Sequence, residues 1–245
     1  MRRKSLLNRS GVDWGDHTGR YPILYNANIY YGCQHDCQYC YSRKIYYWKD
    51  PWREAEPVEN AVELAGKEVK RKEPGRIMFC SMCDPYQPIE GKLGLARRVL
   101  ETLLDSKFLT LIMTKSDLVT RDYDIIQGHD NVEVGFTITS LDDLPMWEPE
   151  APGNKRRIEA LKKAHNLGIK TFVSMEPTIP GETRPIEIME ALSPWVDRWI
   201  IGALNYMSVD PSFYRREVPK WAEYVDKKNL KVKWKKELKP HLTTP

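Results

Sequence analysis

The sequence of 245 residues predicts an α/β fold built on a parallel sheet, and two patterns indicate it. Six short segments are almost continuously apolar and rich in Val, Ile, Phe, Tyr or Thr, which is typical of parallel strands covered on both faces. Segments whose apolar residues recur at helical spacing lie between them. Because these connections are too long for hairpins, strand and helix alternate about six times, as in successive βα units.

The elements follow one another in a regular order. The strands are expected at Ala27–Tyr31, Arg76–Met82, Leu109–Lys115, Val132–Ser140, Ile169–Glu176 and Arg198–Asn205. Apolar stripes predict helices around Ala61–Val69, Leu95–Leu103 and Ile158–Leu167, with Gly168 ending the third, and further helices at Pro185–Leu192 and Pro219–Val225. Six such units fit an incomplete barrel and also fit an open doubly wound sheet.

The two ends of the chain differ from its middle. Residues 1–25 are predicted to form a loose polar arm, residues 26–210 the α/β unit, and residues 211–245 a helix and a lysine-rich end packed on that unit. Within that end, Lys227–Lys239 contains interspersed Val and Trp and could add one edge strand.

The composition is that of a packed globular protein. Hydrophobic residues make up 41% and charged residues 29%, which excludes a disordered chain, a collagen-like repeat and a disulfide miniprotein. The net charge of +4 permits an anionic partner without requiring one. No apolar run approaches the ~20 residues that cross a bilayer, and the N-terminus lacks the apolar core of a signal peptide. We therefore expect a cytoplasmic protein with no membrane partner.

Five cysteines, Cys33, Cys37, Cys40, Cys80 and Cys83, lie in the first third of the chain. An odd, clustered set without a secretion signal is more typical of metal or redox chemistry than of disulfides. The first three follow the first predicted strand at its carboxyl end, where parallel α/β folds place their chemistry. Soft thiolates at such short spacings select zinc or an iron–sulfur cluster.

Two kinds of metal centre compete for these thiolates. A structural zinc would need a fourth ligand, which His35 could supply, but structural zinc usually joins two knuckles that are well separated in sequence. A [4Fe–4S] cluster normally takes four cysteines, so three would leave one iron open to another ligand. The cluster is the favoured interpretation, and the zinc site is the alternative.

The motif Cys-x3-Cys-x2-Cys, with Tyr39 before its last cysteine, resembles the radical S-adenosylmethionine (SAM) superfamily. Several runs resemble its spore photoproduct lyase-like branch: Asn28–Cys33, Tyr39–Arg43, Cys83–Glu90, Thr114–Ser116, Arg121–Asp122 and Glu148–Pro149. The similarity covers roughly residues 25–205. It implies an incomplete (β/α)6 radical SAM barrel with parallel strands, open on one side.

The resemblance also implies an activity. The open iron of the cluster would bind the amino and carboxylate groups of SAM, and an external one-electron reductant would supply the electron that cleaves SAM to methionine and a 5′-deoxyadenosyl radical. That radical would abstract hydrogen from a substrate. The cofactors supply the difficult chemistry, and the protein supplies orientation and exclusion of water.

By the same resemblance, the SAM contacts lie at the ends of successive strands. They are Tyr39 near the adenine, Ser81, Cys83 or Asp84 at the amine, Lys115 at the carboxylate, Thr137 at the ribose, and Glu176 and Asn205 facing the pocket. Related proteins have Ser or Thr directly before the Asp, whereas this chain has Cys83. The alternatives are a solvated surface lysine at 115 and a strand-filling threonine at 137.

Cys80 and Cys83 form a separate Cys-x2-Cys pair. They could ligate a metal, fill the core as small hydrophobic residues, or donate a hydrogen atom to a product radical, as a cysteine near this strand end does in spore photoproduct lyase. That donor position falls nearer Ser81 than either cysteine, so the match is displaced by one or two residues.

Three kinds of function remain open at the level of sequence. The basic arm, the lysine-rich end and the 8 Trp and 13 Tyr favour a radical enzyme acting on nucleic acid, unless the lysines are merely solvated and the aromatics lie in strands. A radical enzyme acting on a peptide or small metabolite is the second, and a non-enzymatic zinc-binding module the third. Because the chain is short for this branch, a partner protein or a large substrate is expected to close the open side of the barrel.

Overall fold

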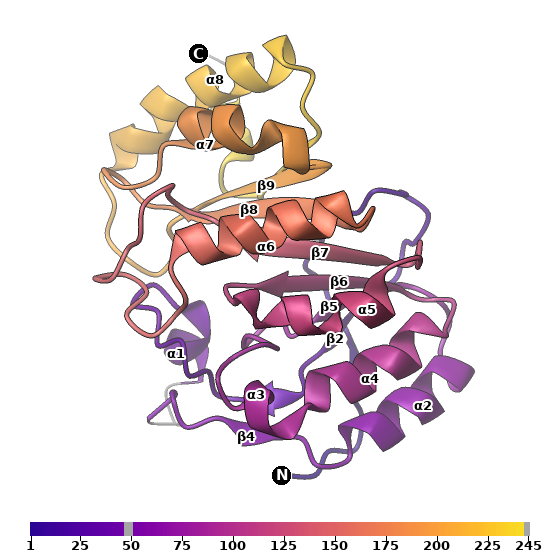
Figure 1. The fold of residues 1–245 in the computed structure, drawn as a ribbon. Coiled ribbons are helices and arrows are strands. Elements are labelled where there is room, and N and C mark those ends of the chain that lie inside the picture. The colour runs from indigo at the N-terminus through magenta and orange to yellow at the C-terminus, as the bar shows by residue number, and fades with distance from the viewer. Residues whose placement is uncertain (47–50, 243–245) are drawn as a thin grey trace.

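The computed structural model describes residues 1–46 and 51–242, and eight strands of these residues form one sheet in the order β1-β2-β5-β6-β7-β8-β9-β10 (Figure 1). β1 (Leu7–Arg9) is antiparallel to β2, and every other neighbouring pair is parallel. The remaining strands of the sheet are β2 (Leu24–Ala27), β5 (Arg76–Phe79), β6 (Leu109–Thr114), β7 (Val132–Thr137), β8 (Lys170–Thr178), β9 (Arg198–Ala203) and β10 (Val232–Trp234). β3 (Tyr30–Tyr31) and β4 (Glu56–Pro57) form a separate antiparallel ribbon.

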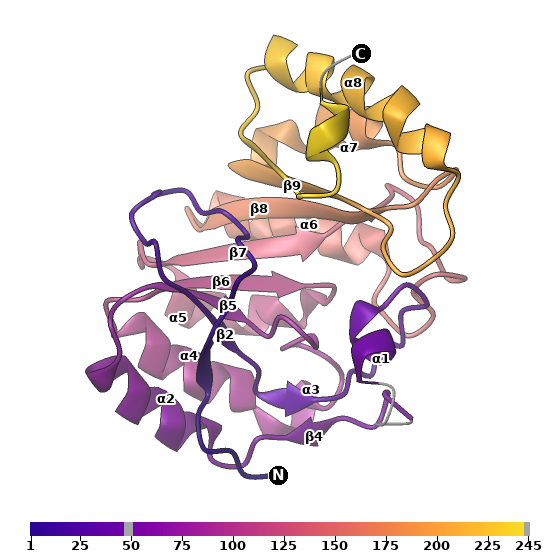
Figure 2. The same ribbon diagram turned by 180° about the vertical axis from the view of Figure 1, so that it is seen from behind.

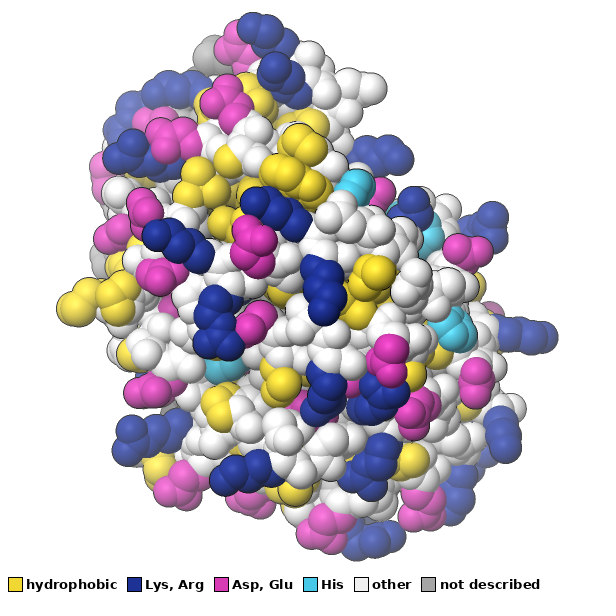
Figure 3. Space-filling model, in the orientation of Figure 1, with side chains coloured by type: hydrophobic (Ala, Val, Ile, Leu, Met, Phe, Trp, Pro, Cys, Tyr) yellow, Lys and Arg dark blue, Asp and Glu magenta, His cyan; other side chains and the backbone are white. Residues whose placement is uncertain are grey.

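Helices cover one face of the sheet, and Figure 1 shows α2, α4, α5 and α6 in front of the strands. The α-helices are α1 (Tyr41–Ile45), α2 (Ala61–Arg71), α3 (Glu90–Leu93), α4 (Leu95–Leu104), α5 (Tyr123–Ile126), α6 (Asn154–Asn166), α7 (Pro185–Leu192) and α8 (Pro211–Lys227), with short 3₁₀ helices η1 (Asp117–Asp122), η2 (Ser193–Trp195) and η3 (Lys239–His241). Their solvent side carries positive and negative side chains interspersed rather than gathered by sign (Figure 3). No helix among the described residues is long and apolar enough to span a bilayer.

The predicted parallel α/β fold is confirmed, and the strand order follows the chain as an incomplete barrel requires. β10 confirms the extra edge strand in the lysine-rich end. The strand expected over Ala27–Tyr31 is wrong in its bounds, because β2 ends at Ala27 and the Asn28 side chain accepts a hydrogen bond from Met82 N (3.0 Å). Ile29 and Tyr30 are fully buried, although neither belongs to the eight-stranded sheet. The apolar run in the sequence therefore indicated burial and not strand pairing within the barrel.

The N-terminal segment, expected to be a loose polar arm, packs on the sheet instead. Leu6 and Leu7 are fully buried, and both of their backbone N–H groups donate to the Glu68 carboxylate of α2 (3.0 and 2.7 Å). Two buried leucines and two charge-assisted hydrogen bonds explain why this polar stretch is ordered. The division into three segments stays a prediction.

Residues 13–17 cross the concave face of the sheet, where Figure 2 shows the indigo chain in front of the strands. Arg76, at the start of β5, pairs with Asp13 (3.0 Å) and Asp16 (2.8 Å), and Asp13 also pairs with Lys233 of β10. His17 N donates to Glu133 of β7 (2.7 Å). We call residues 13–17 and 233–235 the terminal clamp. This clamp joins β5, β7 and β10 through side chains on one face of the sheet.

Candidate functional site

The loop that carries the three cysteines is anchored at its first residue, Gly32. Gly32 has a φ of +96°, and a Cβ there would lie 2.6 Å from Glu54 O and 2.7 Å from Trp52 O. Only glycine therefore allows this approach, which lets Cys33 N donate to Trp52 O (2.9 Å). The backbone requirement explains why a glycine directly precedes the first cysteine.

Two glutamines join this loop to the segment after β5. Gln34 N donates to Gln87 Oε1 (2.8 Å), and Ile89 N donates to Gln34 Oε1 (2.6 Å). Gln87 is fully buried and its amide also donates to Gly32 O (3.3 Å). The Asp-Pro-Tyr-Gln-Pro run thus positions the cysteine loop, a role that the sequence did not reveal.

Cys33 and Cys37 are buried, Cys40 is half-buried, and all are free thiols. Burial raises the pKa of Cys33, with Asp84 and Cys37 adding to it, and burial raises the pKa of Cys37 to about 12 against the opposing effect of Lys115. These neutral thiols would release their protons on binding a cationic centre. In the described part of the chain, no three His, Cys, Asp or Glu side chains converge on a single-ion position.

Cys80 and Cys83 lie together at the end of β5, close to this loop. Both are buried, Cys83 Sγ donates to Tyr30 O (3.4 Å), and Cys80 has a left-handed φ of +62°. The pKa of Cys83 is raised mainly by its hydrogen bond with Cys80 and secondly by burial. A negative charge on Cys83 would in turn raise the pKa of Cys33. Cys83 is therefore a neighbour of the first cysteine of the motif.

Asp84 connects the cysteine loop to two strand ends. Its Oδ1 accepts from Thr114 Oγ1 (2.6 Å) and Tyr86 N (2.8 Å), while its Oδ2 accepts from Lys115 N (2.7 Å) and lies 3.3 Å from His35 Nδ1. Burial raises the pKa of Asp84, but His35 and these hydrogen bonds outweigh it and lower the pKa to about 2. Both carboxylate oxygens are thus already engaged within the protein.

The Asp84→Asn variant is expected to lose about 2–3 kcal/mol of unfolding free energy at neutral pH, because a pKa lowered from 3.8 to about 2 is worth roughly that much. A lowered carboxyl pKa contributes stability above the unfolded value and loses it as pH falls through the folded one. The difference from the parent protein should therefore shrink as pH falls from 3.8 to about 2. Urea unfolding at a series of pH values measures it, and a pH-independent difference would contradict the assignment.

Tyr39 belongs to a buried network with Glu148 and Arg157. The Tyr39 hydroxyl donates to Glu148 Oε1, and the Arg157 guanidinium donates to Glu148 Oε2 and to the carbonyls of Pro152 (2.8 Å) and Thr137 (3.0 Å). Burial raises the pKa of Glu148, but Arg157 and then Lys115 outweigh it, so the net shift is downward. The carboxylate stays ionised and fixes the tyrosine that precedes the last cysteine.

The role of Arg157 was missed by sequence reasoning, although a signal was present. Arg157, Ala160, Leu161 and Ala164 occupy one face of α6 at helical spacing, and all four are buried. A lone arginine in an apolar stripe indicates a buried partner, and here that partner is Glu148.

Lys115 directly follows β6 and lies beside Tyr39. It is half-buried, and its Nζ lies 5.4 Å from the Tyr39 ring centroid. Among the described residues, no carboxylate lies within ion-pair distance of this ammonium. Burial lowers the pKa of Lys115, but Cys37 and Glu148 outweigh it and raise the pKa overall. A charged ammonium beside the cysteine loop is therefore available to an anionic ligand.

The other residues predicted to contact SAM differ in their burial and in their partners. Thr137 is buried at the end of β7, and the Ser81 carbonyl accepts a hydrogen bond from Tyr41 Oη (2.6 Å). Glu176 lies on β8 with Oε2 3.4 Å from Lys235 Nζ, and burial raises its pKa. Asn205 is exposed and donates to Glu237 (3.2 Å). The roles given to these residues, and to the cysteines, stay predictions.

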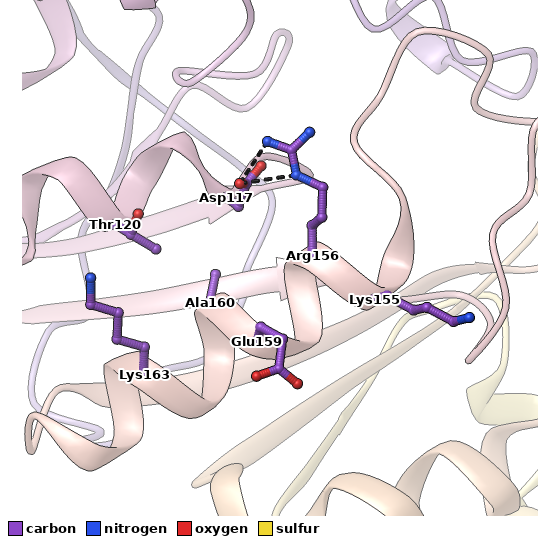
Figure 4. A pocket seen from close by; sticks show the side chains of 7 residues that line it. All are labelled: Asp117, Thr120, Lys155, Arg156, Glu159, Ala160 and Lys163. Atoms are coloured by element: carbon purple, nitrogen blue, oxygen red, sulfur yellow. Dashed lines mark hydrogen bonds and ion pairs between the residues drawn. The ribbon is translucent and has the colours of Figure 1, made fainter.

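Two surface cavities lie away from this set of residues. One of about 350 Å³ lies between η1 and α6, where Arg156 pairs with Asp117 at 2.8 Å (Figure 4). Another of about 390 Å³ lies between the start of α7 and α8, with Phe213 and Trp221 in its lining. Neither includes a predicted site residue.

Comparison with known proteins identifies the protein family of this chain. The model of the radical SAM superfamily matches residues 27–193, and the chain belongs to that superfamily. Curated relatives include "Uncharacterized protein MJ0683" of Methanocaldococcus jannaschii, 37% identical over 66% of this chain and 66% of its own. "Uncharacterized protein ORF301" of Acidianus two-tailed virus is 31% identical over 67% of this chain and 59% of its own. The chain thus spans about two thirds or less of these relatives.

Solved structures share the fold. Spore photoproduct lyase complexed with dinucleoside spore photoproduct has a TM-score of 0.62 and 16% identity, covering 82% of this chain and 59% of that one. Streptococcus suis SuiB bound to S-adenosylmethionine has a TM-score of 0.60 and 14% identity, covering 86% and 49%. The partial-barrel fold expected from the sequence is confirmed.

The residues present fit the cofactors that this superfamily uses. Three soft thiols share one short loop at the carboxyl ends of the strands, as an iron–sulfur cluster requires. Lys115 offers a cation without a carboxylate partner in the described residues, as the carboxylate of SAM would require.

Proposed function

We propose that this chain binds a [4Fe–4S] cluster through Cys33, Cys37 and Cys40 and cleaves S-adenosylmethionine reductively at its open iron. The observation that carries the proposal is the placement of three free thiols in one loop beside the Lys115 ammonium, which has no carboxylate partner among the described residues. When bound, the cluster and SAM supply a 5′-deoxyadenosyl radical that abstracts hydrogen from the substrate. The protein supplies binding, orientation and exclusion of water.

The chain's own residues would hold SAM at several points. Lys115 pairs with the methionine carboxylate, and Tyr39, fixed by Glu148, presents its ring beside the adenine. The amine contacts Ser81, Cys83 or Asp84, of which Asp84 already has both oxygens occupied. Thr137, Glu176 and Asn205 complete the contacts. Cys80 and Cys83 are candidates for returning hydrogen to the product radical.

Anaerobic reconstitution tests this activity. The protein should become brown, retain about four irons per chain, and form 5′-deoxyadenosine from SAM once a one-electron reductant such as dithionite is added. A colourless protein that holds one zinc, or an iron-loaded protein that forms no deoxyadenosine, would contradict the proposal. In a cell, the reductant is proposed to be a cytoplasmic electron-transfer protein.

We further propose a nucleic-acid substrate. The solved lyase with this fold is complexed with a dinucleoside photoproduct, and Tyr206, which follows β9, has 59% of its surface exposed where it could stack on a base. The basic ends support the idea less than expected, because Arg2 pairs with Glu63 and Lys233 with Asp13.

Binding of single-stranded DNA tests the proposed nucleic-acid substrate. Tyr206→Ala should weaken binding of a short oligonucleotide by about 1–3 kcal/mol, because it removes one stacking platform, whereas Tyr206→Phe should keep it. Fluorescence anisotropy at rising salt measures both the affinity and its salt dependence. Equal affinity of the two variants, or no binding by the parent protein, would remove the nucleic-acid hypothesis.

A peptide or small metabolite is the second candidate substrate. The loop between β7 and α6 carries exposed carboxylates at Asp142, Asp143 and Glu150, which would repel a phosphate backbone. Deuterium transfer from labelled peptides or metabolites into 5′-deoxyadenosine would identify such a substrate.

A further inference from the structure

Lys235, which follows β10, lies inside the barrel although it belongs to the lysine-rich end. Its backbone N–H donates to Ile201 O (2.9 Å), and its side chain is only 9% exposed. The ammonium lies 3.4 Å from Glu176 Oε2 and 3.4 Å from the Trp14 ring centroid. A buried ammonium is costly unless it is paired, and here a carboxylate and an indole face stabilise it from two sides.

Gly202 of β9 leaves room for the ion pair between Lys235 and Glu176. A Cβ at Gly202 of β9 would lie 2.9 Å from Glu176 Cγ and 3.0 Å from Lys235 Cγ. The missing side chain therefore lets both long side chains lie across the strand. Trp14 is itself held, because Arg198 donates to its carbonyl (3.1 Å).

The Glu176 carboxylate still has hydrogen-bonding capacity. Its Oε2 forms an ion pair with Lys235 but accepts no hydrogen bond from the described residues. The charged groups that act on it are Lys235, Glu237 and Lys115. Lys115 is the proposed carboxylate partner of SAM, so Glu176 lies on the side of the barrel that faces the candidate site.

We propose that Lys235 is a positioning residue that holds Glu176 ionised and oriented to accept hydrogen bonds from the hydroxyl groups of bound SAM. This rests on the proposed function. An ionised carboxylate accepts two hydroxyl donors, whereas a protonated one donates at one oxygen. The C-terminal strand, together with Trp14 of the terminal clamp, thereby completes a binding wall that the six βα units leave unfinished.

The Lys235→Met variant tests this, because methionine keeps an unbranched side chain over Trp14 and removes the charge. Without the ammonium, Glu176 remains protonated to higher pH. SAM affinity of the reconstituted variant, measured by anaerobic titration calorimetry, should fall about tenfold relative to the parent near pH 6. The deficit should shrink as pH rises, because Glu176 then ionises in both proteins. A purely structural role would give the same deficit at every pH.

Three controls separate the outcomes. Lys235→Arg should restore affinity, and Lys233→Met, whose parent side chain pairs with Asp13, should not change the pH profile. If Lys235→Met does not fold, the double variant Glu176→Gln/Lys235→Met, which leaves no unpaired charge, should bind SAM weakly and without pH dependence.

A second readout needs no SAM. Because a carboxyl with a raised pKa loses stability as pH rises through that pKa, the melting temperature of cluster-free Lys235→Met should fall more steeply than that of the parent as pH rises above 4.5, the ordinary pKa of the carboxyl. A parent-like SAM affinity and pH profile in Lys235→Met, or a strongly pH-dependent affinity in the double variant, would overturn the role of Lys235 while leaving SAM cleavage intact. Failure of the parent protein to bind SAM would overturn both proposals.

Discussion

Replacing Cys33, Cys37 and Cys40 together by alanine is expected to remove the iron and abolish the formation of 5′-deoxyadenosine. Changing residues that merely orient metal ligands typically costs about 10–100-fold in metal affinity or activity, so loss of the ligands themselves should exceed about 100-fold. Iron content after reconstitution and deoxyadenosine yield under dithionite measure the two effects. The thiols are small and lie in a loop, so the variant is expected to fold.

The matched control for this experiment is Cys80→Ala. Cys80 is buried at the end of β5, outside the motif loop, so the variant should retain its iron and still cleave SAM. If Cys80 donates hydrogen to the product radical, product yield falls while deoxyadenosine formation persists. Iron retention by the triple variant, or iron loss from Cys80→Ala, would show that the cluster has other ligands.

Glu148→Gln is expected to destabilise the protein by about 3–5 kcal/mol, because Arg157 would keep a buried charge without its carboxylate. The double variant Glu148→Gln/Arg157→Met should recover much of this loss, since no isolated charge remains. Urea unfolding measures both. Glu159→Gln, which breaks an exposed pair with Lys162, should cost less than about 1 kcal/mol.

Glu148→Gln should also affect the cysteine loop. The Tyr39 hydroxyl loses a charged acceptor, so the residue before Cys40 becomes less ordered. SAM affinity should therefore fall even at temperatures where the variant is folded. Parent-like stability together with parent-like SAM affinity would show that Glu148 does not organise the site.

The parts of the fold that are encoded locally were predictable. Helix α7 has the predicted bounds, Pro185–Leu192, and the motif cysteines follow the first short strands of the chain as expected. Periodicity and turn residues carry this information within a window of about 11–18 residues. The superfamily followed from the motif in the same way.

Contacts between distant segments were not predictable. The burial of Ile29 and Tyr30 outside the eight-stranded sheet looks the same in sequence as burial within it. Lys233 and Lys235 alternate with Val232 and Trp234, a two-residue period that places both lysines on one face, yet terminal lysines are usually solvated. Their partners, Asp13 and Glu176, lie far away along the chain, and no local sequence pattern indicates them.

The terminal clamp has a consequence for how the molecule is made. Asp13 and Lys233 are 220 positions apart, and Trp14 and Arg198 are 184 apart. During synthesis, residues 13–17 can form these contacts only after residues 198 and 233 have also been translated. Contacts of such long range form slowly, so the terminal clamp is expected to close late in folding, after the strands that it joins have paired.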